Sequence, residues 1–165
     1  IKDYYEQSKI KTVLSMTVVN SMANDTETPE QKIKETLGYK DDPYSKVEIG
    51  VNLTTDSEMA EFDYNAQMAY VAQIQAGSID IMVMPEKLYQ TLKKNEPFAD
   101  LKELMGEEAF EKFGMQTDTT HISITDSEFE QELGVIYDPV CIAVPYSAPN
   151  QENAVKWIKS LDNRK

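Results

Sequence analysis

Apolar residues recur along this chain with two periods, and segments of the two kinds alternate. In residues 46–53, Val47, Ile49 and Val51 occupy every second position, which is typical of a half-buried strand. In residues 151–161, Ala154 and Ile158 are four residues apart, which favours one face of a helix. Alternation of strands and helices at this length predicts a layered α/β fold.

The same reasoning extends to the whole chain. Strands are expected at 12–19, 46–53, 79–84, 120–125 and 140–144, and helices at 29–37, 59–76, 86–94, 98–113, 126–133 and 151–161. Thr28 and Asn150 are expected to cap the first and last helices, and Gly106 to interrupt the fourth. Met68, Val71 and Ile74 are expected to face the core from the second helix. The pattern therefore predicts a three-layer sandwich with a mostly parallel central sheet.

The chain is long enough for one domain, and nothing in it resembles a linker or an internal repeat. Residues 12–165 are expected to form a single α/β domain, and residues 1–11 a lead-in arm. Because the chain begins with Ile1 rather than Met, we expect an upstream signal peptide or membrane anchor to have been removed.

Composition narrows the classes of partner. Of the 165 residues, 41% are hydrophobic, which suits a globular protein with a core of its own. The net charge of −13 argues against nucleic acid and against direct docking on anionic lipid, since both require clustered Lys and Arg. No apolar run is long enough to span a bilayer.

Sequence motifs for common cofactors and nucleophiles are absent. The chain contains neither of the glycine-rich nucleotide-binding motifs, nor the serine motif of α/β-hydrolases. The single cysteine excludes an intrachain disulfide, and the single histidine leaves most histidine-based metal sites short of ligands. We therefore expect no cofactor, no metal site and no enzymatic activity.

His121 and Cys141 leave one alternative open. The two residues could act together as a base and a nucleophile. Alternation within both strands favours another interpretation, in which Cys141 is a small core residue and His121 an exposed strand residue. The methionines are interpreted as core fillers, namely Met59, Met68, Met82, Met84, Met105 and Met115, with Met84 notable because it ends a strand.

Open parallel sheets bind ligands beyond the carboxyl ends of their strands, and this rule selects the candidate site. Six residues at the predicted strand ends are the candidate ligand-binding residues: Asn20, Ser21, Thr54, Met84, Glu86 and Tyr146. They offer short hydrogen-bonding groups, one charge and one aromatic face. The alternative is that they only cap helices and turn the chain.

Three segments resemble parts of the bacterial extracellular solute-binding proteins, the binding components of ABC importers. Residues 76–85 are similar to that family's AG-x-x-D-I strand entry, residues 98–104 to the x-x-L-x-x-L segment that follows it, and residues 150–161 to its A-x-x-F-x-x-x-L helix. Family members have two α/β lobes, and the second lobe is inserted where this chain has only residues 115–138. The chain therefore resembles a single lobe.

The resemblance implies a protein that works outside the cytoplasm, at the cell surface, tethered to a membrane through an upstream segment. It would take part in transport by binding a small solute weakly, or a partner protein, at the carboxyl edge of its sheet. The alternative is an interaction or sensory module without a small ligand, in which another chain or a dimer mate supplies the second lobe.

Overall fold

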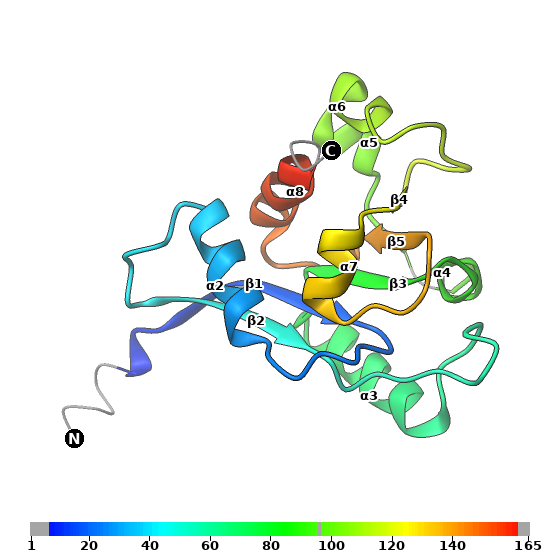
Figure 1. The fold of residues 1–165 in the computed structure, drawn as a ribbon, viewed down its shortest axis with the longest axis horizontal. Helices are drawn as coiled ribbons and strands as arrows, with labels where there is room; N and C mark the ends of the chain where they lie inside the picture. Colours follow the sequence, from blue (N-terminus) through cyan, green and yellow to red (C-terminus); the bar gives the residue numbers. More distant parts are fainter. Residues whose placement is uncertain (1–6, 96, 162–165) are drawn as a thin grey trace.

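The computed structural model describes residues 7–95 and 97–161, which form one five-stranded mixed sheet flanked by helices (Figure 1). The strands are β1 (Lys11–Val18), β2 (Ser45–Gly50), β3 (Ile81–Pro85), β4 (Ile122–Ile124) and β5 (Val140–Ala143). Their order across the sheet is β2-β1-β3-β5-β4. Most of the lead-in arm expected over 1–11 lies outside the described residues.

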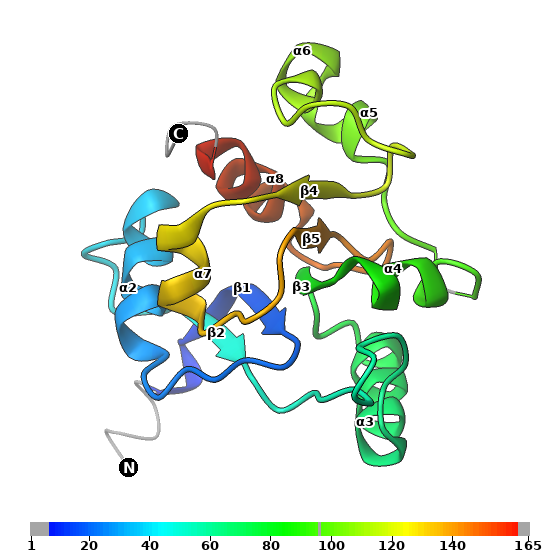
Figure 2. The same ribbon diagram turned by 45° about the vertical axis from the view of Figure 1, so that its right-hand side comes forward.

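Helices cover both faces of the sheet (Figure 2). They are α2 (Glu27–Thr36), α3 (Tyr64–Gln75), α4 (Glu86–Leu92), α5 (Leu101–Met105), α6 (Glu107–Glu111), α7 (Ser127–Leu133) and α8 (Gln151–Ser160). Helices α3 and α4 contribute side chains to one side of the core, and the remaining helices to the other. This arrangement is compatible with the predicted three-layer sandwich. None of the described helices is both long and apolar enough to cross a membrane.

The sheet is mixed, so the expectation of a mostly parallel sheet is wrong. β1 pairs in parallel with β2 and β3, but β5 is antiparallel to both β3 and β4. A helix between two strands usually crosses the sheet and makes them parallel. The connection between β4 and β5 contains α7 but leaves the two strands antiparallel. Helix α7 packs beside α2 and α8, through the Phe129–Trp157 ring contact and the Lys32–Glu132 ion pair. The chain thus re-enters the sheet at the end where it left.

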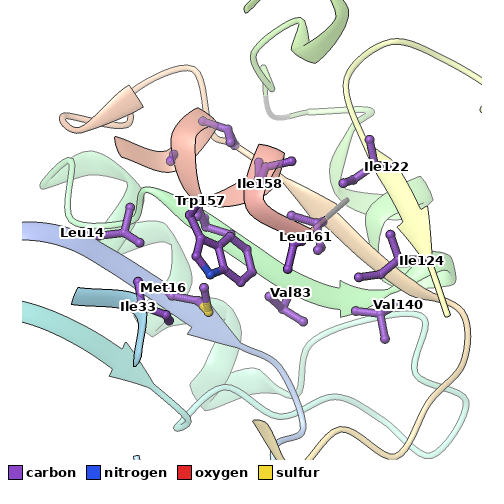
Figure 3. Packing of buried hydrophobic residues seen from close by; sticks show 14 of the residues in the cluster. Leu14, Met16, Ile33, Val83, Ile122, Ile124, Val140, Trp157, Ile158 and Leu161 are labelled. Atoms are coloured by element: carbon purple, nitrogen blue, oxygen red, sulfur yellow. The ribbon is translucent and has the colours of Figure 1, made fainter. Parts of the chain in front are cut away.

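The strand periodicity divides the core between the two faces of the sheet. In β3, Ile81 and Val83 face α8, whereas Met82 and Met84 face α3 and α4. Figure 3 shows the indole of Trp157 lying above β1 and β3 on the first of these faces. Burial on both faces explains why β3 is apolar throughout.

Helix α3 differs most from its prediction. The expected helix began at Met59, but the structure places Met59 at φ +58° in a turn, and α3 begins after Asp63. The Asp63 carboxylate accepts a hydrogen bond from the Ala66 amide at 2.8 Å and caps the helix. Met68 and Val71 are exposed, against expectation, because α3 contacts the core through the narrow face that carries Ala66 and Tyr70.

Two other local expectations change. Helix α2 begins at Glu27, two residues earlier than a Thr28 cap allows, and the Asp25 carboxylate accepts from the Glu27 amide at 2.9 Å. Asn150 precedes α8 but makes no side-chain cap. Met115 is fully exposed, so it is not a core filler. The interruption at Gly106, at φ +91°, is confirmed.

Candidate functional site

The loops that follow β1 and β2 are joined to each other at the carboxyl edge of the sheet. Asn20 donates from Nδ2 to the Thr55 hydroxyl at 2.8 Å, and its Oδ1 accepts from the Thr55 amide at 3.0 Å. The backbone of Asn20 adopts a left-handed conformation, with φ +54°, and its amide donates to the Leu53 carbonyl at 3.0 Å. These bonds join the loop after β1 to the loop after β2.

An open depression of about 460 Å³ lies beside this junction. It is lined by Asn52, Thr54, Asp63, Tyr64, Asn65, Ala66 and Ala69, which belong to the loop after β2 and to the first turns of α3. Thr54 donates its hydroxyl proton to the Asp63 carboxylate, and this bond lowers the pKa of Asp63. Of the six predicted site residues, Thr54 lines this depression directly.

The other predicted residues are dispersed. Ser21 donates to the Leu133 carbonyl at 2.6 Å and thereby fixes the loop after β1 to the end of α7. Met84 is completely buried, so it cannot contact a ligand in this structure. Tyr146 is exposed, but it lies at the opposite end of the sheet, because β5 is antiparallel to β3 and ends beside Met82. Placing Tyr146 at the carboxyl edge was therefore wrong, and the reversed strand is the reason.

Three exposed apolar side chains lie on segments that adjoin the carboxyl edge, and the sequence reasoning missed them. Met22 follows β1, Tyr64 opens α3, and Ile136 leads into β5; each exposes more than half of its surface. A second depression, of about 410 Å³, lies between the loop at Met22 and the end of α7. The sequence signal for these exposed side chains is an apolar residue within an otherwise polar segment.

A buried polar cluster surrounds His121, whose exposed surface is only 1%. Its Nδ1 lies 2.5 Å from an oxygen of Asp118, and its Nε2 lies 3.3 Å from an oxygen of Glu86. The ring also stacks against Tyr89 of α4, with 4.4 Å between ring centroids. The expectation of an exposed His121 is therefore wrong, because α4 covers the polar face of β4.

Further hydrogen bonds hold both carboxylates in this cluster. Asp118 accepts from the Tyr89 hydroxyl at 2.9 Å and from the Lys93 ammonium at 3.0 Å. Glu86, the last of the six predicted site residues, accepts from Gln90 at 3.0 Å and from Ser123 at 3.0 Å. Glu86 thus faces β4 instead of the carboxyl edge. Its position after a buried strand, and the Asp118-x-x-His121 spacing, are the sequence signals that marked this cluster.

The contacts determine the protonation behaviour of the cluster. The His121 hydrogen bond, opposed by burial, lowers the pKa of Glu86 to about 2. Burial lowers the pKa of His121, but the hydrogen bonds to Glu86 and Asp118 outweigh it, so the pKa is raised overall. Burial would raise the pKa of Asp118, yet its bonds to His121 and Lys93 hold it below the usual range.

Cys141 lies beside this cluster, on β5 opposite Ser123 of β4. Its thiol is completely buried, and burial together with the neighbouring Glu86 carboxylate raises its pKa well above the ordinary value. A thiol attacks substrates as the thiolate, so a raised pKa weakens it as a nucleophile. His121 and Cys141 do come together, but the surroundings disfavour a base–nucleophile pair.

Comparison with protein-family models, with curated proteins and with known structures finds no match to this chain.

Proposed function

We propose that this chain is a non-enzymatic binding lobe that holds a small polar solute at the carboxyl edge of its sheet. The observation that carries the proposal is the depression beside the Asn20–Thr55 junction. Its volume of about 460 Å³ falls in the range of small-molecule sites, roughly 300–1,000 Å³. The resemblance to extracellular solute-binding proteins supports the same function, outside the cytoplasm and tethered through an upstream segment.

The lining residues favour a neutral or cationic solute. Asn52 and Asn65 expose amides that both donate and accept hydrogen bonds, and Tyr64 offers an aromatic face. Asp63 supplies the single charge among the lining residues, and it is negative. The net charge of −13 adds a field that repels anions. A sugar, a polyol or a polyamine therefore fits this surface better than a phosphate or a carboxylate.

Weak affinity follows from the open shape. A tight site buries 70–90% of its ligand, and one face of a sheet edge cannot enclose a solute on all sides. A second lobe, from another chain or from a dimer mate, would complete the enclosure. The exposed Met22, Tyr64 and Ile136 favour this second candidate function, an interaction module in which the same edge binds a protein.

A thermal-shift screen of the purified chain tests the first candidate, with sugars, polyols, amino acids, short peptides and polyamines. A chelator in every sample removes any contribution from metal ions. A solute at about 100 times its Kd raises the free energy of unfolding by about 2.7 kcal/mol. We expect a saturable rise in Tm for one neutral or cationic class.

Variants assign the response to the depression. Asn52→Ala and Asn65→Ala should weaken the shift, whereas Glu152→Ala, in a depression at the opposite edge of the sheet, should leave it unchanged. No shift across the panel, with a concentration-dependent dimer by sedimentation velocity, would replace solute binding by the interaction module. No shift and a monomer at all concentrations would contradict solute binding and the dimeric form of the interaction module.

A further inference from the structure

Three potential metal-binding atoms converge at the buried cluster around His121. A carboxylate oxygen of Glu86, a ring nitrogen of His121 and the sulfur of Cys141 all lie within 4.8 Å of one another. The residues come from three separate elements: the start of α4, the position before β4, and β5. Within residues 7–95 and 97–161, no other group of three or more His, Cys, Asp or Glu side chains lies close enough together to share an ion.

The separation between His121 and Glu86 suits a tetrahedral ion. Two ligands bound at 2.0–2.2 Å to a tetrahedral zinc ion lie about 3.4 Å apart. The Nε2 atom of His121 and the Oε1 atom of Glu86 are 3.3 Å apart, which is close to that separation. The sulfur of Cys141 would complete a nitrogen, oxygen and sulfur donor set, which zinc accepts readily.

The surroundings of His121 provide an independent argument. Histidine ligands usually donate their other ring N–H to a carboxylate, which fixes the tautomer and turns the free nitrogen toward the metal. Asp118 lies 2.5 Å from Nδ1 of His121, on the side of the ring away from Glu86. Asp118 is itself held by Tyr89 and Lys93. This arrangement leaves Nε2 directed at Glu86.

We propose that Glu86, His121 and Cys141 bind a zinc ion and that Asp118 positions His121 for it. The Glu86 side chain is 31% exposed, so an ion can reach the cluster from that side. Binding converts the Cys141 thiol to a zinc-bound thiolate and releases its proton to solvent; a proton on Nε2 of His121 is released in the same way. Three protein ligands leave the fourth position to water. This site is separate from the solute-binding depression and does not depend on it.

Cobalt(II) and zinc are the probes that test the proposal, used on the whole chain after treatment with a chelator. Many exposed carboxylates will bind ions loosely, so the decisive readout is the thiolate-to-cobalt charge-transfer absorption in the near ultraviolet. We expect this band to saturate at one cobalt ion per chain and to disappear when zinc is added. Zinc should also raise the Tm of the chelator-treated protein.

Two variants test proposed ligands, a third tests the positioning residue and a fourth is the control. Cys141→Ser should remove the charge-transfer band, and Glu86→Gln should weaken zinc binding at least about 10-fold. Asp118→Asn should keep the band but weaken affinity by about 10–100-fold, because it removes a positioning group and no ligand. Glu108→Gln, an exposed carboxylate on α6, is the matched control and should change nothing.

The wild-type protein alone can overturn the proposal, so the outcome does not depend on whether each variant folds. If it shows no charge-transfer band with cobalt, or if zinc binds with no saturation at one ion per chain, the site does not exist. A band that persists in Cys141→Ser would also contradict it. In these cases the cluster is an ion pair between protonated His121 and the two carboxylates.

Discussion

The carboxylate of Asp80 holds Asn150 at two points. The amide of Asn150 donates to Oδ1 of Asp80 at 2.8 Å, and its side-chain nitrogen donates to Oδ2 at 3.0 Å. Oδ2 also accepts from the amide of Ser15 at 2.8 Å. One buried carboxylate therefore joins β1, the residue before β3 and the start of α8. The role of Asp80 in this fold is structural.

Replacing Asp80 should destabilise the fold strongly. Asp80→Ala leaves the Ser15 and Asn150 donors without their acceptor, and each unpaired buried donor costs about 1–3 kcal/mol. We expect the free energy of unfolding, measured in urea, to fall by about 3 kcal/mol. Asp100→Ala is the matched control: it removes an exposed cap of α5 and should cost about 1 kcal/mol. Equal losses in the two variants would contradict the role assigned to Asp80.

Asn20 should show two separable contributions to stability. Asn20→Gly removes the hydrogen bonds to Thr55 but tolerates φ +54°, so we expect a loss of about 1–2 kcal/mol. Asn20→Ala removes the same bonds and adds roughly 1 kcal/mol of left-handed backbone strain. Alanine should therefore be the less stable variant in urea unfolding. If Asn20→Ala were as stable as Asn20→Gly, the left-handed backbone at this position would not affect stability.

Gly134 and Gly114 form a matched pair for a steric prediction. Both have positive φ, +66° and +90°. A Cβ added at Gly134 would lie 2.3 Å from the Ala23 amide nitrogen, whereas one added at Gly114 would meet nothing within 4 Å. We expect Gly134→Ala to lower Tm much more than Gly114→Ala, whose cost is limited to about 1–2 kcal/mol of backbone strain. Similar Tm values by circular dichroism would exclude close packing of the loop after β1 against α7.

Glu130 should make the protein less stable as the pH rises. Burial and the nearby Asp138 and Asp126 carboxylates raise the pKa of Glu130 above its ordinary value of 4.5. The folded state then binds this proton more tightly than the unfolded chain, so the stabilisation is present at low pH and is lost as the pH rises above about 4.5. Glu130→Gln should raise the free energy of unfolding at pH 7 by about 0.5 kcal/mol.

The control for this prediction lies on the same helix. Glu128→Gln removes an exposed charge from the first turn of α7 and should give no increase in stability at pH 7. Urea unfolding at pH 4 and pH 7 measures both variants. Glu130→Gln should have a smaller decrease between the two pH values than the wild type. An unchanged pH dependence would show that Glu130 titrates normally in the folded protein.

Much of the secondary structure was predictable because it depends on local pattern. The β-branched run in β1 and the alternation of Val47 and Ile49 in β2 each predicted a strand that the structure contains. A helix was expected to end at residue 133, and Gly134, which follows it, adopts the left-handed conformation after α7. Periodicity failed at α3, where Met68 and Val71 follow a helical pattern but face solvent.

The predictions of site residues also succeeded in part and failed in part. The prediction that polar residues follow the strands selected Asn20 and Thr54, and both lie at the carboxyl edge in the structure. It also selected Tyr146, which lies at the other end, because β5 runs antiparallel to β3. No local pattern encodes that direction.

The sequence by itself determined the order of strands and helices, the acidic surface and the division of β3 between two faces, because each depends on residues close together in the chain. Only the tertiary structure decided that β5 is antiparallel and that α4 covers His121. It also brought Glu86, His121 and Cys141 together from positions up to 55 residues apart. Such long-range contacts form when whole elements pack to bury their apolar faces, so each contact depends on the packing of all the elements.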